Sequence, residues 1–131
     1  MPIDTDPIHL PNNQYLWLFF RFSGRLSRVA FLLTFLLMVV VVSFPLYQFM
    51  RVPAESLAGQ TWSVLFGVIF VTFLWVHIAT SVKRLHDMGK PGILAVSLFI
   101  PVVSIIVFLI LCLFPGNPGP NQYGRYANSA Q

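Results

Sequence analysis

Charged and polar side chains gather in two short segments of this otherwise apolar chain. Their arginines, histidine and single aspartate are groups that form ion pairs, bind phosphates or move protons. Both segments border long apolar runs, so we expect them at one membrane surface. The candidate residues in these segments are Ser23, Gly24, Arg25, Arg28, Arg84, His86, Asp87 and Gly89.

Asp87 is the acid in the middle of the second basic segment, with no other acid between Glu55 and the C-terminus. A charge at a bilayer edge strongly prefers a partner, which favours an ion pair with one of the nearby arginines. A site for anionic lipid headgroups, built by the same arginines, is the second interpretation. A catalytic pair with His86 is the third, and no nucleophile stands at a known spacing from it.

The start of the first long apolar run carries both a helix cap and basic residues. Ser23 is predicted to be the N-cap, because its hydroxyl can accept a hydrogen bond from a free amide. Arg25 and Arg28 then lie near the positive end of the helix dipole, which is locally unfavourable. Lipid phosphates, water or Asp87 are the expected compensation.

A second group of polar side chains lies inside the second apolar run. His77, Thr80 or Ser81, and Arg84 follow the spacing of one helix face. His77 would lie about 10 Å below Arg84 along the helix axis. A histidine at that depth is a candidate for a proton or ion path. An interhelical hydrogen bond is the simpler interpretation, and we favour it.

The elements that position these groups are predicted from composition. The chain is 56% hydrophobic and 9% charged, whereas a soluble domain has about 25% charged residues. Its eight Lys and Arg residues outnumber four acids but flank apolar runs rather than forming a patch, so we expect no nucleic-acid partner. Cys112 has no cysteine partner, and no motif predicts a metal or cofactor.

The predicted fold is an all-α membrane protein in a single domain, 1–131. Three apolar runs each reach the roughly 20 residues that a helix needs to cross a bilayer. The aromatic segment 15–22 is too short to cross and is expected to be an interfacial helix, or else a flexible tail. The expected spans are 29–50, 61–82 and 91–114, followed by an irregular tail, 115–131.

The third run allows two arrangements because Pro101 lies near its middle. A kinked single span would place the tail on the far side of the membrane. A re-entrant hairpin would return the tail to the starting side, although its legs of about 15 Å are too short to cross. The single span is the favoured prediction.

The basic residues predict the orientation. Six of them flank the side shared by the N-terminal segment and the second loop, and two flank the other side. Lys and Arg prefer the cytoplasm, so the N-terminus is expected there. Residues 1–13 contain two aspartates and no Lys or Arg, unlike a signal peptide.

Three motifs in the same order resemble the DUF805 family of small bacterial inner-membrane proteins. They are FSGRLSR (22–28), KRLHDMGKPG (83–92) and FPGNPGPNQYG (114–124). The third motif adds Asn121, Tyr123 and Gly124 to the candidate residues. Lys83 stands where the family pattern has an arginine, which keeps the charge. The resemblance implies an inner-membrane protein with a few helices and no known activity.

Together these observations predict a non-enzymatic membrane protein. Its cytoplasmic Arg/His/Asp cluster would serve helix packing, anionic lipid binding or partner binding, and membrane lipids, a second copy or a membrane protein are the expected partners. A small oligomeric transporter or channel that uses His77 is the alternative. An enzyme acting on lipids is a third hypothesis, without a catalytic signature.

Overall fold

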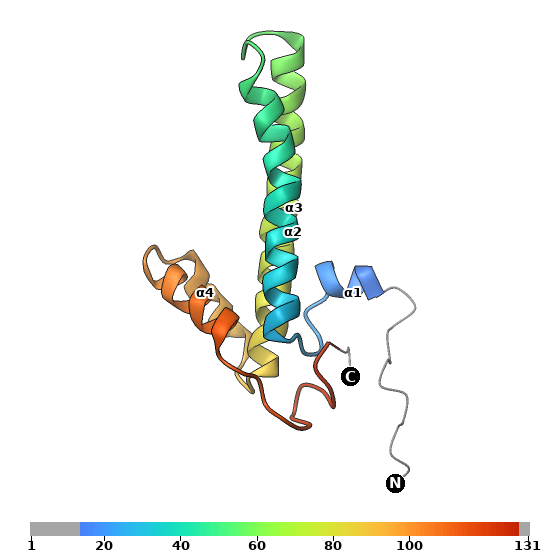
Figure 1. Ribbon diagram of the computed structural model, residues 1–131, viewed down its shortest axis with the longest axis vertical. Coiled ribbons are helices and arrows are strands. Elements are labelled where there is room, and N and C mark those ends of the chain that lie inside the picture. The colour runs from blue at the N-terminus through green and yellow to red at the C-terminus, as the bar shows by residue number, and fades with distance from the viewer. Residues whose placement is uncertain (1–13, 129–131) are drawn as a thin grey trace.

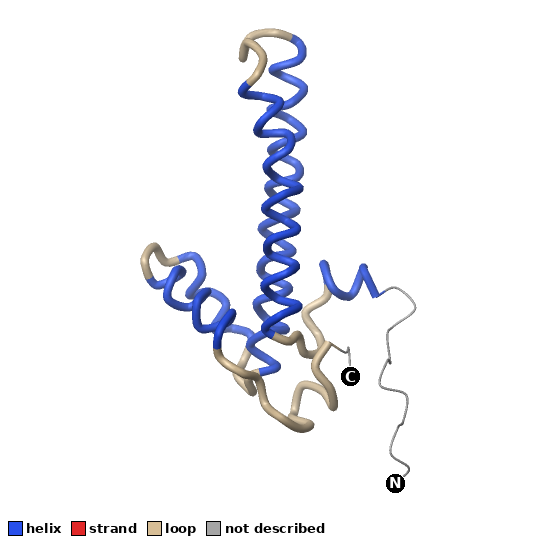
Figure 2. Tube along the Cα trace, in the orientation of Figure 1, coloured by secondary structure: helices blue, strands red, loops and turns tan. Residues whose placement is uncertain are grey.

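The computed structural model describes residues 14–128, and every regular element in that range is helical. Residues 1–13, which the sequence distinguishes from a signal peptide, and the last three residues lie outside the described range. Figures 1 and 2 show a long helix pair with shorter elements gathered at one end. The elements are α1 (Gln14–Phe20), α2 (Arg28–Met50), α3 (Leu57–Asp87), the 3₁₀ helix η1 (Gly92–Phe99) and α4 (Val103–Leu113).

Helices α2 and α3 form the long pair, and both are long and apolar enough to cross a membrane. Their lengths are about 35 Å and about 46 Å at the usual rise per residue. Only 17% of the most apolar window of each helix is buried inside the protein. A core helix of a soluble protein would be mostly buried, so these exposed apolar surfaces are suited to lipid.

The start of α2 corrects the predicted cap. Ser27, not Ser23, is the N-cap, and its Oγ accepts a hydrogen bond from the Ala30 amide at 3.2 Å. Ser23 lies four residues earlier, in the segment before the helix, and is exposed. Pro45 neither ends nor interrupts α2, which continues to Met50.

Helix α3 extends beyond the predicted span at both ends. Its last turns therefore carry Lys83, Arg84 and Asp87, which the sequence pattern assigned to a loop. The helix ends in a Schellman motif, in which the Gly89 amide donates to the His86 carbonyl and the next amide donates to the carbonyl of Leu85. Gly89 has a φ of 73°, a left-handed conformation that favours glycine.

The third apolar run is not one helix, contrary to the favoured prediction. Residues 100–102 separate η1 from α4, and the two short helices form a hairpin (Figure 1). Pro101 lacks an amide hydrogen and disfavours a helical residue before it. Ile100 accordingly has extended dihedral angles, and Val102 has a φ of 70°. Each leg is about 16 Å long, too short to cross a bilayer alone.

The hairpin returns the tail to the end of the α2–α3 pair where α1 lies (Figure 2). This corrects the prediction that the tail emerges at the opposite end. The buried apolar cluster lies at the same end, where α1, η1 and α4 contribute to it. Its buried members are Trp17, Leu26, Phe31, Val82, Leu85, Ala95 and Leu111.

Candidate functional site

Asp87 lies between two arginines in the interior of the protein. Its Oδ1 accepts from Arg25 at 2.9 Å, and its Oδ2 accepts from Arg84 Nη1 at 2.9 Å. All three residues are at most 4% exposed. Because charge-assisted hydrogen bonds are strong in such surroundings, this ion triad joins the segment before α2 to the end of α3. We call these three residues the clamp.

The clamp contains two positive charges and one negative charge, and backbone carbonyl groups supply further acceptors for Arg25. Arg25 donates to the carbonyl oxygens of Asn117 and Gly119 at 2.7 Å each, and to that of Gly124 at 3.2 Å. A guanidinium has five donors in a fixed plane, so one side chain can hold several chain segments in register. Arg25 therefore holds residues 117–124 of the predicted irregular tail against the segment before α2.

Arg84 connects the clamp to the end of α4. Its Nε donates to the Leu111 carbonyl at 2.7 Å, and its Nη2 donates to the carbonyl of Phe114. The last carbonyl groups of a helix lack partners within the helix and carry a partial negative charge. A buried guanidinium supplies both the missing donors and the compensating charge.

The backbone of the tail packs directly against Asp87. The Asn117 amide donates to the Asp87 carbonyl at 2.7 Å. Gly116 lies so close that an added Cβ would come within 1.9 Å of Asp87 Oδ2. Asn117 and Gly116 were not among the predicted site residues, although the third motif contains both.

His86 also contacts the tail and the segment before α2. Its Nδ1 lies 3.0 Å from the Gly24 carbonyl oxygen, and its ring stacks on Tyr123 with centroids 4.0 Å apart. The Asn121 amide side chain donates to the His86 carbonyl at 2.8 Å, and Asn121 and Gly124 pair across a turn. Within residues 14–128 the imidazole makes no hydrogen bond to the neighbouring Asp87 carboxylate, whose two oxygens accept from Arg25 and Arg84.

Lys83 is buried, although its place at the end of an apolar run predicted only a flanking charge. It is 0% exposed, and its Nζ donates to the carbonyl oxygens of Trp17 and Leu18 at the end of α1. The ammonium also lies 4.5 Å from the centroid of the Trp17 ring. Trp17 is 3% exposed and donates to the Ser23 carbonyl at 2.7 Å, so its ring packs inside the protein.

Arg28 differs from the clamp arginines because its side chain is exposed. Its Nη1 donates to the Leu113 carbonyl at 2.8 Å, and its other donors make no hydrogen bond within residues 14–128. The side chain borders a cleft of about 270 Å³ between α2 and α4. The other residues that line this cleft are Val29, Leu32, Leu33, Cys112 and Leu113.

The polar side chains predicted to share one face of α3 have partly apolar surroundings. The Thr80 hydroxyl donates to carbonyl groups of its own helix, and Ser81 Oγ is buried without a hydrogen-bond partner within residues 14–128. His77 lies among phenyl rings, with Phe35 and Phe108 at centroid distances of 5.5 Å and 6.1 Å. Phenyl rings, and not polar side chains, therefore surround the His77 end of this helix face.

Comparison with known proteins is consistent with these features. A family model described as a protein of unknown function, DUF805, matches residues 19–125. Inner membrane protein YhaI from Escherichia coli strain K12, and its counterpart from strain O157:H7, are each 36% identical over 57 residues. This alignment covers 44% of the chain and 48% of each relative, so it spans about half the length of these relatives.

No solved structure significantly matches the chain. The inner-membrane relative and the two exposed apolar helices support a membrane protein. The family model covers well over half of the sequence and includes all three motifs. The protein therefore belongs to the DUF805 family, whose function is unknown.

Proposed function

We propose that this is a non-enzymatic protein of the bacterial inner membrane that binds anionic lipid headgroups at its basic end. In this proposal α2 and α3 cross the bilayer and the η1–α4 hairpin enters it without crossing. The observation that carries the proposal is the exposed Arg28 at the edge of an apolar cleft. The clamp is the scaffold that holds this end together.

The orientation follows from the distribution of basic residues about the α2–α3 pair. Arg51 lies in the loop at the far end, and the other seven Lys and Arg residues lie at the end that holds the tail. Such asymmetry favours a cytoplasmic location for the basic end. The fold thus strengthens the bias beyond the six-to-two distribution of a three-span arrangement.

Both termini are expected on the cytoplasmic side. Reporter fusions that are active only in the cytoplasm, placed at each terminus in turn, check this expectation. A fusion at Glu55, in the opposite loop, is the matched control and should be inactive. A C-terminal fusion active only outside the cytoplasm would contradict the re-entrant hairpin.

Three of the arginines at this end, the two of the clamp and Arg28, have different capacities for a ligand. Arg25 and Arg84 are buried, and protein oxygens accept from their donors. Arg28 has one hydrogen bond to a carbonyl oxygen and remains exposed. A lipid phosphate accepts several hydrogen bonds and carries the charge that an exposed guanidinium prefers. Arg28 is therefore the favoured headgroup contact.

The cleft beside Arg28 fits the apolar part of the same ligand. Its walls are Val29, Leu32 and Leu33 from α2 and two residues from the end of α4. An acyl chain that lies along α2 would bury apolar surface while its phosphate stays at the guanidinium. The cation and the apolar walls together favour a phospholipid over a free phosphate ion.

Arg28→Ala is expected to reduce anionic lipid binding about fivefold, since one basic side chain near a membrane surface contributes roughly 1 kcal/mol. Retention of phosphatidylglycerol by the purified protein, followed by native mass spectrometry, measures this. Arg51→Ala is the control because it removes an exposed arginine from the opposite end. Equal lipid retention by Arg28→Ala and wild type would overturn the proposal.

A further inference from the structure

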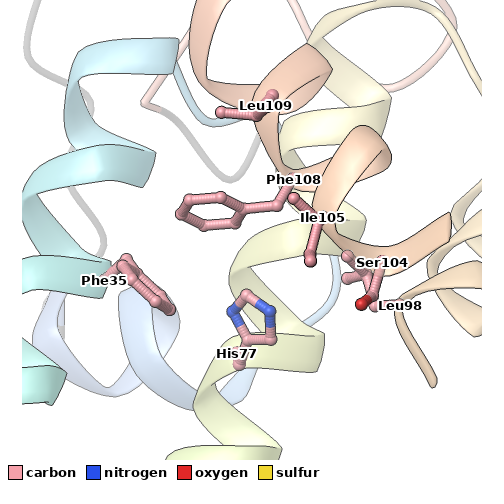
Figure 3. A pocket seen from close by; sticks show the side chains of 7 residues that line it. All are labelled: Phe35, His77, Leu98, Ser104, Ile105, Phe108 and Leu109. Atoms are coloured by element: carbon pink, nitrogen blue, oxygen red, sulfur yellow. The ribbon is translucent and has the colours of Figure 1, made fainter. Parts of the chain in front are cut away.

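A second cleft lies around His77, where α2, α3, η1 and α4 meet. It has a volume of about 270 Å³ and is open to the outside of the protein. Figure 3 shows the imidazole below Phe108, with Phe35 on one side and Ile105 and Ser104 on the other. We propose that this cleft binds a planar lipophilic ring that carries a carbonyl group, such as a quinone headgroup, entering from the membrane.

The polar groups of the cleft lack partners in the protein. Within residues 14–128 neither the ring nitrogens of His77 nor the hydroxyl of Ser104 make a side-chain hydrogen bond, although the backbone amide of Ser104 does. In the proposed membrane placement, His77 lies about 15 Å from Asp87 along α3, near the middle of the bilayer. Water is scarce at that depth, so a polar ligand atom is the partner that would satisfy these donors.

The apolar walls favour a ring rather than an acyl chain. Two phenyl rings, those of Phe35 and Phe108, line the cleft beside His77, at centroid distances of 5.5 Å and 6.1 Å from the imidazole. Aromatic rings pack well in offset and edge-to-face arrangements at these distances. A flat ring placed among them makes such contacts, which a flexible chain does not.

The size of the cleft indicates which part of the ligand enters. Pockets for whole drug-sized ligands begin at about 300 Å³, slightly above the volume here. A single substituted ring fits, and its apolar tail would remain in the lipid. In this arrangement a ring nitrogen of neutral His77, which carries a proton, donates to the carbonyl oxygen, and the Ser104 hydroxyl supplies a second donor.

This proposal is independent of the proposed lipid site. The Arg28 cleft and the His77 cleft share no lining residue, and they lie on different parts of α2 and α4. Arg28→Ala is therefore expected to leave ring binding unchanged. Loss of lipid retention and loss of ring binding are thus separate outcomes.

The test titrates the full-length protein in lipid nanodiscs with a decyl-substituted benzoquinone and measures binding by calorimetry. Empty nanodiscs give the partitioning background. His77→Phe preserves an aromatic ring but removes both nitrogens, and it is expected to weaken binding about tenfold, as for one lost buried hydrogen bond. His77→Gln retains a donor and should bind more tightly than His77→Phe. Ser104→Ala should weaken binding by a smaller factor.

Decylbenzene, which has the ring and tail but no carbonyl, separates hydrogen bonding from simple partitioning. It should bind more weakly than the quinone and should not distinguish His77→Phe from wild type. Circular dichroism verifies that each variant retains the helical content of wild type. The proposal is overturned if wild type does not bind the quinone above background, if decylbenzene binds equally well, or if folded His77→Phe and wild type bind the quinone equally.

Discussion

Asp87→Asn is expected to lower the free energy of unfolding by about 3–5 kcal/mol, the usual cost of breaking a buried ion pair from one side. The replacement has nearly the same shape, so packing changes little. The carboxylate is the acid that faces Arg25 and Arg84, and both arginine residues are at most 2% exposed. Without it, two buried positive charges retain only neutral carbonyl groups as partners.

Chemical unfolding in detergent micelles, followed by circular dichroism, measures this loss. Hydrogen exchange of the Asn117 and Gly124 amides should become faster in this variant. Both amides are hydrogen-bonded, and both residues accept hydrogen bonds from Arg25 of the clamp. Glu55→Gln is the matched control, since Glu55 is the exposed acid of the opposite loop. Unfolding of Asp87→Asn at the wild-type denaturant concentration would show that the clamp does not hold this end.

Gly116→Ala is expected to destabilise the protein by about 1–3 kcal/mol or more, the range for overpacking a filled interior. The added Cβ would meet Asp87 Oδ2 at 1.9 Å, its carboxyl carbon at 2.5 Å and its backbone oxygen at 2.9 Å. None of these atoms is the free end of a flexible chain, because Asp87 is bound on both oxygens. The tail must therefore move away from α3, or the carboxylate must leave an arginine.

Gly119→Ala is a closely matched control in the same tail. A Cβ at Gly119 has no heavy atom within 4 Å, and its carbonyl still accepts from Arg25 after the change. The same unfolding measurement, together with the rate of trypsin cleavage at Arg125, compares the two variants. Gly116→Ala should be less stable and cleaved faster, whereas Gly119→Ala should behave like wild type. Identical behaviour of both alanine variants would contradict the close packing of Gly116 on Asp87.

Properties that depend on the composition of a single segment could be predicted from the amino-acid sequence. Apolar runs longer than about 20 residues predict helices that suit a bilayer, because a helix satisfies its own backbone there. Both long helices appear in the structure, as Arg28–Met50 and Leu57–Asp87. The three motifs likewise indicated the family, because their residues and order are properties of the chain alone.

Features that depend on contacts between distant segments became visible only in the folded protein. Pro101 permits either a kink or a turn, and packing of α4 against α2 and η1 accompanies the turn. Ser27 and Ser23 are both suitable caps by type, and the path of the chain selects Ser27. No local pattern showed that Lys83 is buried beneath α1, since a charge at a helix end usually remains in water.

The clamp illustrates the same division. The sequence placed one acid among several basic residues and thereby predicted an ion pair, because unpaired charge at a bilayer edge is costly. It did not show which arginines would pair with Asp87, since Arg25, Arg28 and Arg84 are chemically equivalent. The pairing depends on the path of the tail. Carbonyl groups of the tail accept from Arg25, and carbonyl groups at the end of α4 accept from Arg84, whereas Arg28 remains exposed. Those carbonyl groups are the same in every sequence, and only the fold brings them to the guanidinium groups.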